Sequence, residues 1–185
     1  MEKARTRMDL LTKPQGSLGR MEDLAVQLAG ISGGYFPTGS RKRVVVMAAD
    51  HGITEEGISA YPSEVTVQMM ANFTSGGAAI NVLGRLNNVD VEVVDVGVKI
   101  DAGLPGVRKV RIKGGTDNFR RQPAMSRAEA VQAILAGAEV AREAGREGIK
   151  VLATGEMGIG NTTASSAVMA TLTGYELSLV VGRGT

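Results

Sequence analysis

The sequence has no cysteine, no tryptophan and one histidine, and its other aromatic residues are three tyrosines and three phenylalanines. Without cysteine the chain has no disulfide, no thiol nucleophile and no thiolate ligand for zinc or an iron–sulfur cluster. So few aromatic rings argue against a stacking surface for nucleic acid. Apolar runs of the ~20 residues that span a membrane are missing too, and the charged N-terminus is unlike a signal peptide. We therefore expect a cytoplasmic protein with no nucleic-acid or membrane partner.

What is present is an ordinary globular composition, with 43% hydrophobic and 22% charged residues in a chain of 185 and a net charge of +2. A chain of this length buries roughly 70% of its unfolded surface, which is enough for a genuine core. The basic residues are scattered, and we interpret their small clusters as solvated surface in preference to a phosphate site. These clusters comprise Arg108, Lys109, Arg111, Lys113, Arg120 and Arg121.

Residues 1–40 are predicted to form a helical arm and a linker. The stretch PQGSLGR at 14–20 is typical of a loop, and Ser17 is a candidate cap for the helix that follows. Apolar residues recur at helical spacing over 18–30, which predicts an amphipathic helix whose apolar stripe needs a partner. The turn-rich segment 33–43 is interpreted as the linker to the rest of the chain.

Residues 41–185 alternate between short β-branched runs and helical patterns. Besides a short extra strand at 107–112, the runs predict buried strands at 44–49, 91–96, 149–154 and 178–182. Between them, helices are predicted from Pro62 with a break near Ser75, from Ser126, and over 161–174. This alternation predicts an α/β fold with a parallel sheet and flanking helices.

The helix from Ser126 is the longest one predicted. Its expected core stripe consists of Ala130, Val131, Ile134, Leu135, Ala138 and Val140.

Each predicted strand ends in a distinctive loop. Because ligands of parallel sheets bind outside the carboxyl ends of the strands, these loops are expected to share one edge. They are 50-DHG-52, 95-DVG-97, 155-GEMGIGN-161 and 182-GRGT-185.

The loop from Gly155 to Thr162 has the spacing of a phosphate-binding P-loop, but Asn161 stands where that loop carries lysine. The missing cation argues against a nucleoside triphosphate, and the spacing does not fit the dinucleotide fingerprint. The glycines and the start of a helix would still suit a monophosphate, or would stabilise Glu156 as an anion. A plain turn with an exposed glutamate fits the spacing equally well. Asn161, Thr162 and Thr163 are candidate helix caps.

Two further features fit either an ordinary structural role or a functional one. His51 is more typical of a polar residue that fixes a loop than of a metal ligand or a general base. The stretch 59–70 mixes apolar and hydrogen-bonding groups that suit a pocket for a flat heterocycle, although helix packing of Val65 and Met69 is the more ordinary explanation.

Several stretches together closely resemble the N-terminal half of the nicotinate-nucleotide:dimethylbenzimidazole phosphoribosyltransferase family, and the likeness covers essentially the whole chain. They are LTKPQGSLGRMEDLAVQLAGI at 11–31, ADHGITEEGISAYPSEVTVQM at 49–69, GGAAINVL at 76–83, VDVGV at 94–98, AMSRAEA at 124–130, TGEMGIGNTT at 154–163 and VGRGT at 181–185.

The resemblance implies a pentosyltransferase of cobalamin biosynthesis. Such an enzyme moves 5-phosphoribosyl from nicotinate mononucleotide to 5,6-dimethylbenzimidazole, which gives α-ribazole 5′-phosphate and nicotinate without a cofactor or a metal. It also implies a homodimer and a Rossmann-like sheet with a small helical domain. Residues 41–185 would be the N-terminal part of the α/β nucleotide-binding domain, and the arm at 1–40 would belong to the small domain.

The resemblance also assigns roles to single residues. Glu156 would be catalytic, because it can stabilise positive charge on the ribose or assist the incoming base. Phosphate and ribose would be bound by Gly158, Gly160, Asn161, Thr162, Gly182, Arg183, Gly184 and Thr185. The benzimidazole would lie near Tyr61, Pro62, Ser63, Gln68 and Met69.

One departure limits the assignment. The family's principal catalytic glutamate lies near the end of the full-length chain, in a glycine-rich motif that is not part of these 185 residues. We therefore expect a truncated chain that is inactive by itself. The alternative is a non-catalytic mononucleotide-binding module, and a phosphotransferase dependent on Mg²⁺ and a nucleoside triphosphate ranks third.

Overall fold

A computed structural model describes residues 1–34, 40–101 and 103–182 of the chain. These residues divide into two compact units, Met1–Ser40 and Arg41–Thr185. In the described ranges no helix is both long and apolar enough to cross a bilayer.

The first unit is a pair of helices, α1 at Glu2–Asp9 and α2 at Arg20–Ile31. The helix expected over 18–30 is present, but its N-cap is Gly19 with φ 55°, so the prediction that Ser17 caps it is wrong. The buried Glu22 carboxylate accepts hydrogen bonds from Lys13 Nζ at 2.7 Å and from Leu18 N at 3.1 Å, which lowers its pKa. Of the linker predicted over 33–43, residues 35–39 lie outside the described residues, and its last two residues, Lys42 and Arg43, already belong to a strand.

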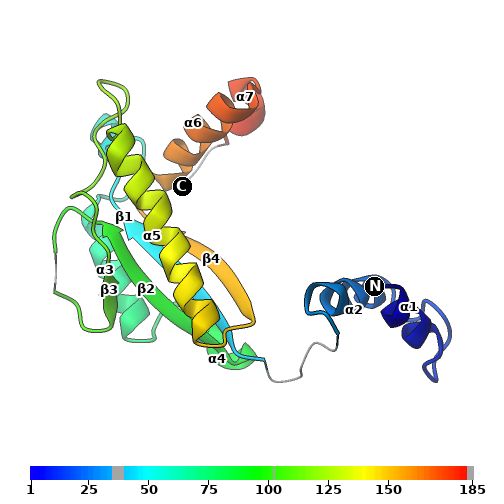
Figure 1. The fold of residues 1–185 in the computed structure, drawn as a ribbon. Helices are drawn as coiled ribbons and strands as arrows, with labels where there is room; N and C mark the ends of the chain where they lie inside the picture. The colour runs from blue at the N-terminus through cyan, green and yellow to red at the C-terminus, as the bar shows by residue number, and fades with distance from the viewer. Residues whose placement is uncertain (35–39, 102, 183–185) are drawn as a thin grey trace. The chain divides into compact units, whose positions relative to one another are not determined.

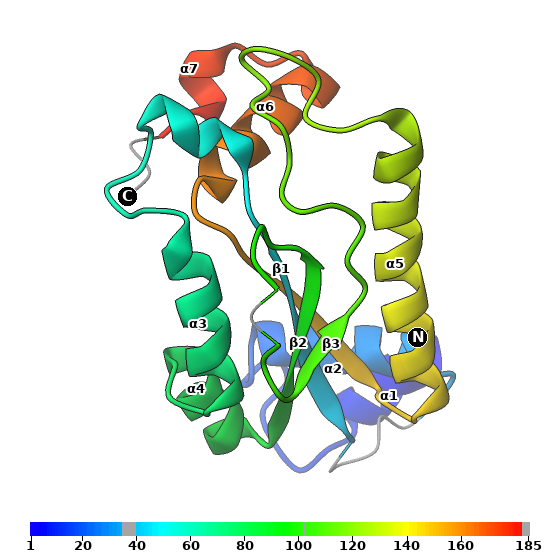
Figure 2. The same cartoon turned by 90° about the vertical axis from the view of Figure 1, so that its left-hand side faces the viewer.

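The second unit is built on a parallel four-stranded sheet, as the alternating pattern predicts (Figures 1 and 2). The strands lie in the order β3-β2-β1-β4. Their bounds are Lys42–Ala49 for β1, Val89–Gly97 for β2, Val107–Lys109 for β3 and Val151–Met157 for β4. Val93 and Val94, which are neighbours on the central strand β2 and face opposite sides of the sheet, are both almost fully buried, because helices cover both faces.

One face is covered by α3 at Glu64–Thr74 and α4 at Ala79–Asn87, and the other by α5 at Arg127–Arg146 (Figure 2). On the α3 side, Met70 packs with Ala48 and Val93 of the sheet. On the α5 side, Val140 packs with Val45 and Val94. The break expected near Ser75 is confirmed, since α3 ends at Thr74 and α4 starts at Ala79.

The start of α5 was predicted correctly, but of its expected core stripe only Val140 is buried. Ser126 Oγ accepts from Glu129 N at 3.2 Å, and the Glu129 carboxylate accepts from Ser126 N at 2.6 Å, which completes a capping box. The buried residues are Ala136, Val140 and Ala144, whereas Ile134 is 73% and Leu135 60% exposed. The helix carries two apolar stripes. The stripe with Ala136 and Ala144 faces the sheet, because small side chains let the helix and the sheet approach closely. Val131 and Ala138 are exposed as well.

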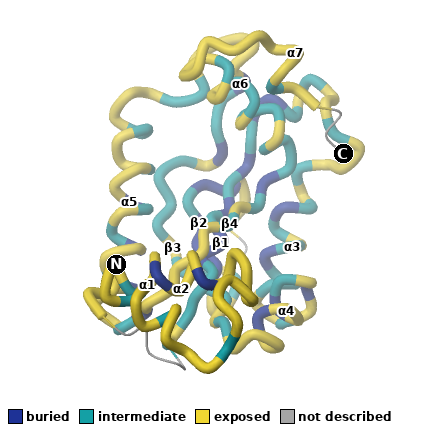
Figure 3. Tube along the Cα trace, turned by 90° about the vertical axis from the view of Figure 1, so that its right-hand side faces the viewer, coloured by how far each residue is buried: buried dark blue, intermediate teal, exposed yellow. Residues whose placement is uncertain are grey.

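Two strand predictions need correction. β4 starts and ends later than the expected 149–154, so Gly155 and Glu156 belong to the strand, and Val151 to Thr154 are exposed on a sheet edge (Figure 3). The strand expected at 178–182 is wrong, because Leu177–Val180 forms the short helix α7. A short apolar run fits either structure, and periodicity does not separate them. The helix expected over 161–174 is present as α6, Asn161–Thr173, and it has no buried residue.

The carboxyl end of β2 is held by a buried aspartate. Asp95 is 2% exposed, and its Oδ1 accepts from the N–H groups of Gly97 and Val98, each at 3.0 Å. Both donors are themselves buried. The turn that leaves the strand therefore depends on this side chain.

We predict that Asp95→Ala lowers the free energy of unfolding by about 3 kcal/mol, because it leaves two buried N–H groups without a partner. Asp95→Asn keeps an acceptor and is expected to cost less. The matched control is Asp101→Ala, which removes a similar 3.0 Å bond to Gly103 N together with an ion pair to Lys109, both at an exposed site where water replaces them. Chemical denaturation measures all three, and equal losses for Asp95→Ala and Asp101→Ala would contradict the prediction.

Candidate functional site

The carboxyl edge of the sheet brings together three of the four predicted loops. In the parallel register, Ala49 at the end of β1 lies beside Gly97 of β2, and Ala48 lies beside Met157 of β4. The fourth loop reaches this region differently, from helix α7 instead of a strand, and only its first residue, Gly182, is described.

Asp50 ties the end of β1 to the turn after β2 and to the segment around Thr116. Its N–H donates to the Gly97 carbonyl at 3.0 Å, its carbonyl accepts from Thr116 N at 3.0 Å, and its Oδ2 accepts from Lys99 N at 2.8 Å. The residue is 2% exposed. Its second carboxylate oxygen is buried without a hydrogen-bond partner among the described residues. Asp50 therefore fixes the end of β1 against two other segments.

The loop that follows β4, residues 158–160, lies so close to its neighbours that only glycine fits at two positions. A Cβ on Gly158 would lie 2.3 Å from the Ala49 carbonyl oxygen and 2.9 Å from His51 Nε2. Gly160 has φ +87°, and a Cβ there would lie 2.9 Å from Thr54 Cγ2. Between them, Ile159 N donates to Thr66 Oγ1 at 3.2 Å. We call residues 158–160 the glycine loop.

Helix α6 begins directly after the glycine loop, so its first N–H groups face the carboxyl edge. The N-cap is Gly160, and no side chain caps the helix. The sequence-based expectation that Asn161, Thr162 or Thr163 would cap it is therefore wrong. Asn161 instead donates from Nδ2 to Glu156 Oε1, and its Oδ1 accepts from Thr162 Oγ1 at 3.2 Å.

Glu156 keeps part of its surface exposed, yet its pKa is raised, because partial burial disfavours the charged form, while the hydrogen bond from Asn161 opposes that shift. In the register of β4 against β1, Glu156 is paired with Met47. It therefore belongs to the end of β4 and not to the first turn of α6. A carboxylate whose pKa is raised is better suited to accept a proton near neutral pH than an ordinary surface glutamate.

His51 is half-buried beside the glycine loop. Burial lowers the pKa of its imidazole, and the neighbouring Asp50 charge only partly compensates. It lines an apolar groove of ≈ 810 Å³ together with Phe119, Met125 and the α6 residues Val168 and Leu172. No group of three or more metal-ligating side chains occurs in the described parts of the chain.

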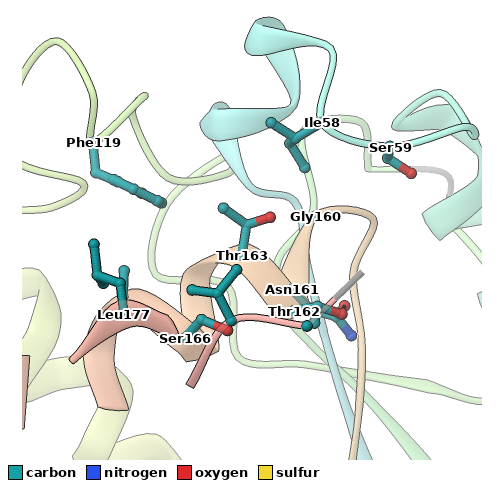
Figure 4. A pocket seen from close by; sticks show the side chains of 12 residues that line it. Ile58, Ser59, Phe119, Gly160, Asn161, Thr162, Thr163, Ser166 and Leu177 are labelled. Carbon is teal, nitrogen blue, oxygen red and sulfur yellow. Dashed lines mark hydrogen bonds between the residues drawn. The ribbon is translucent and has the colours of Figure 1, made fainter. Parts of the chain in front are cut away.

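A second, more polar cavity of ≈ 240 Å³ opens at the start of α6 (Figure 4). Phe119, Ile58 and Ser59 face the first turns of α6 across it (Figure 4). Ser166 also lines it, and its hydroxyl donates to the Val180 carbonyl at 3.0 Å, which holds α7 against α6. The remaining lining residues are Gly160, Asn161, Thr162, Thr163, Ala167, Leu177, Val181 and Gly182.

The structure brings together part of the predicted site. Gly160, Asn161, Thr162 and Gly182 line the cavity, whereas Gly158 does not line it and packs against the Ala49 carbonyl at the end of β1. Glu156 does not line the cavity, but it accepts a hydrogen bond from Asn161, which does. Arg183, Gly184 and Thr185 lie outside the described residues.

The residues expected near the benzimidazole do not line this cavity, which meets the same segment slightly earlier, at Ile58 and Ser59. Among them, Ser63 lies at the N-cap of α3, and its hydroxyl is 3.0 Å from Thr54 Oγ1. Tyr61, Pro62 and Gln68 are exposed, and Met69 is half-buried. Their assignment stays a prediction.

Several residues of this region were missed in the sequence. Thr66 is one of the hydrogen-bonding residues of the stretch 59–70 that was expected to suit a pocket, but its burial and its contact with the glycine loop were not predicted, because the packing stripe was placed on Val65 and Met69. Phe119 lies in a segment without periodicity, Ser59 in the stretch 59–70 and Ser166 in the helix expected over 161–174, and the sequence did not single out any of these three side chains.

Most of the basic clusters are engaged in ion pairs, in agreement with their interpretation as surface. Arg108 pairs with Glu143 at 2.6 Å, Lys109 with Asp101 at 2.8 Å, and Arg121 with Glu56 at 3.1 Å. Lys113 pairs with Asp117, and Arg120 with Glu56. Arg111 donates to the Lys99 carbonyl at 2.7 Å. None of these cations lines the cavity at α6 within the described residues.

Comparison with known proteins supplies a family. A family model described as "Phosphoribosyltransferase" matches residues 1–185. A nicotinate-nucleotide–dimethylbenzimidazole phosphoribosyltransferase from Roseiflexus sp. is 54% identical over 184 residues, 98% of this chain and 52% of its own length. The protein of the same name from Halalkalibacterium halodurans is 52% identical over 96% of this chain and 50% of its own length.

A solved structure is also similar. The crystal structure of CobT from Thermus thermophilus matches with a TM-score of 0.93 and 49% identity, over 100% of this chain and 56% of that one. The chain thus spans about half the length of the curated relatives that it matches.

We predict that Gly158→Ala lowers the free energy of unfolding by about 2 kcal/mol, because the added methyl group overlaps the Ala49 carbonyl and forces the glycine loop to move. Gly137→Ala is the matched control. A Cβ on Gly137 meets nothing within 4 Å in helix α5, so the substitution should be neutral or stabilising. Chemical denaturation gives both values, and a Gly158→Ala variant as stable as the control would show that the close approach is not real.

The single histidine gives a second prediction. The imidazole should titrate below its ordinary pKa of 6.5, since burial disfavours the protonated form. Because the unfolded chain then binds the proton more readily, this contribution to stability is fully present above about pH 6.5 and declines as the pH falls below it. Proton NMR of the one imidazole measures the midpoint, and a value at or above 6.5 would contradict the prediction. His51→Gln should remove this part of the pH dependence.

Proposed function

The chain belongs to the phosphoribosyltransferase family, and from this premise we propose that it supplies the mononucleotide-binding part of a nicotinate-nucleotide:dimethylbenzimidazole phosphoribosyltransferase. The observation that carries the proposal is the cavity at the start of α6, where the glycine loop, Asn161 and Thr162 surround the first N–H groups of the helix. A single phosphate suits this arrangement, because helix N-termini bind anions without a lysine.

In the proposed reaction the bond between the ribose C1′ and the nicotinate nitrogen breaks, and its electron pair stays on that nitrogen. A ring nitrogen of 5,6-dimethylbenzimidazole forms the new bond to C1′, and the other ring nitrogen gives up its proton. Positive charge develops on the ribose as the first bond lengthens. A carboxylate near C1′ stabilises that charge, and a carboxylate near the benzimidazole accepts the proton.

Glu156 is proposed for one of these tasks. Its raised pKa and its bond from Asn161 fit a group held close to a substrate, whereas a glutamate that only solvates the surface would need neither. Gly182 and the following Arg183, Gly184 and Thr185 are also proposed to bind the phosphate. Tyr61, Pro62, Ser63, Gln68 and Met69 remain the proposed contacts of the benzimidazole.

The proposal extends to assembly and location. Residues 1–40 are proposed to join a small helical domain, and 41–185 to form part of the nucleotide-binding domain. Large apolar side chains exposed on α5, Ile134 and Leu135 among them, offer surface for a partner in the proposed homodimer. A cytoplasmic location fits the absence of cysteine.

The test is product formation from nicotinate mononucleotide and 5,6-dimethylbenzimidazole. We would assay the 185-residue chain and a chimera in which residues 1–185 replace the matching half of the Roseiflexus relative. The chimera is expected to form α-ribazole 5′-phosphate, and the 185-residue chain alone is expected to form little or none. In the chimera, Glu156→Gln should lower kcat at least about a hundredfold, as expected when a charged group near the reacting atoms is lost.

The control for this substitution is Glu139→Gln, which alters only exposed ion pairs on α5 and should leave kcat unchanged. An inactive chimera that still binds the mononucleotide would overturn the transferase proposal in favour of a non-catalytic binding module. Equal activity in the Glu156 and Glu139 variants would remove Glu156 from the mechanism.

A further inference from the structure

A buried threonine on a different element holds the glycine loop. Thr66 lies in the first turn of α3 with 0% of its surface exposed. Its hydroxyl oxygen accepts the Ile159 N–H at 3.2 Å, across a separation of 93 residues in the sequence. A fully buried hydroxyl is costly unless it is hydrogen-bonded, and here its partner is the main chain of the loop.

The loop is otherwise positioned by steric contact. Gly158 lies against the Ala49 carbonyl and the His51 ring, and Gly160 lies against Thr54. These contacts limit how close the loop comes to β1, but they do not set the direction of its peptide groups. The bond from Ile159 to Thr66 is directional, so it fixes how the peptide between Gly158 and Ile159 is turned.

That peptide stands directly before the groups that form the cavity. Asn161 N donates to the Gly158 carbonyl at 3.0 Å, and this carbonyl belongs to the same peptide group as Ile159 N. The direction of that peptide group therefore affects the position of Asn161, the first residue of α6. The Asn161 side chain in turn holds Glu156. A rotation of the loop would therefore move both the N–H groups proposed for the phosphate and the carboxylate proposed for the ribose.

We infer that Thr66 is a positioning residue. Its hydrogen bond from Ile159 holds the glycine loop in the orientation in which the start of α6 binds the phosphate of the mononucleotide. This inference rests on the proposed function for the identity of the ligand. Thr66 has no exposed surface, so it acts through Ile159 and touches no substrate.

The experiment uses the chimera with three substitutions. Thr66→Val keeps the shape of the side chain and removes the acceptor, Thr66→Ser keeps the hydroxyl, and Thr74→Val is the control. Thr74 lies on the same helix, is exposed, and bonds only to the Ala71 carbonyl of that helix, at 3.1 Å, among the described residues. The readouts are KM for each substrate, kcat, the exchange rate of the Ile159 amide and the thermal midpoint.

Thr66→Val should raise KM for nicotinate mononucleotide about tenfold, the size of one lost hydrogen bond, and leave KM for 5,6-dimethylbenzimidazole unchanged. It should also speed exchange of the Ile159 amide. Thr66→Ser should stay within about twofold of the wild type, since it rescues the acceptor. An unchanged KM in Thr66→Val, or an equal loss in Thr66→Val and Thr66→Ser that follows only the thermal midpoint, would overturn the inference.

Failure of the proposed function is a separate result. If the wild-type chimera makes no product, the same variants of the 185-residue chain are titrated with inorganic phosphate, and amide shifts are followed at the start of α6. Weaker phosphate binding in Thr66→Val than in Thr66→Ser would then support the positioning role without the transferase. Equal binding, or no shift at these amides in the wild type, would overturn it.

Discussion

The site depends on the close approach between the glycine loop and the end of β1. Gly158 lies so near the Ala49 carbonyl that no side chain fits there, and the loop then turns through the left-handed conformation of Gly160 into α6. This approach places the start of a helix directly above the carboxyl ends of the strands. Parallel sheets bind their ligands at this edge, and here the edge meets the positive end of a helix dipole.

A carboxylate beside a helix start that is proposed to bind a phosphate is at first sight a contradiction. The structure separates the two functions in space, because Glu156 belongs to the end of β4 and the N–H groups belong to α6, with Asn161 between them. Partial burial raises the pKa of Glu156, whereas a phosphate site requires only N–H donors. The absence of the P-loop lysine is consistent with a ligand that carries one phosphate.

The sequence predicted the sheet, the loops and most helices, because strand runs, glycines and the Ser126 cap act through neighbouring residues. It failed where the outcome depends on what lies opposite in space. The sheet accepts the alanine stripe of α5 and not the one with Ile134 and Leu135, and Leu177–Val180 coils into a helix although its composition suits a strand. Glu156 and Asn161 were singled out by the spacing of their loop and received their proposed roles from the family resemblance, while Thr66 and Phe119 gain their roles only from contacts with distant segments.

The most direct test of the account is an amide-shift titration of the 185-residue chain with nicotinate mononucleotide and, in parallel, with the riboside that lacks the phosphate. If the start of α6 is the phosphate site, the mononucleotide shifts the amides of Ile159, Gly160, Asn161, Thr162 and Gly182, and the riboside leaves them nearly unchanged. Equal shifts with both ligands, or shifts confined to residues away from the carboxyl edge, would contradict the account.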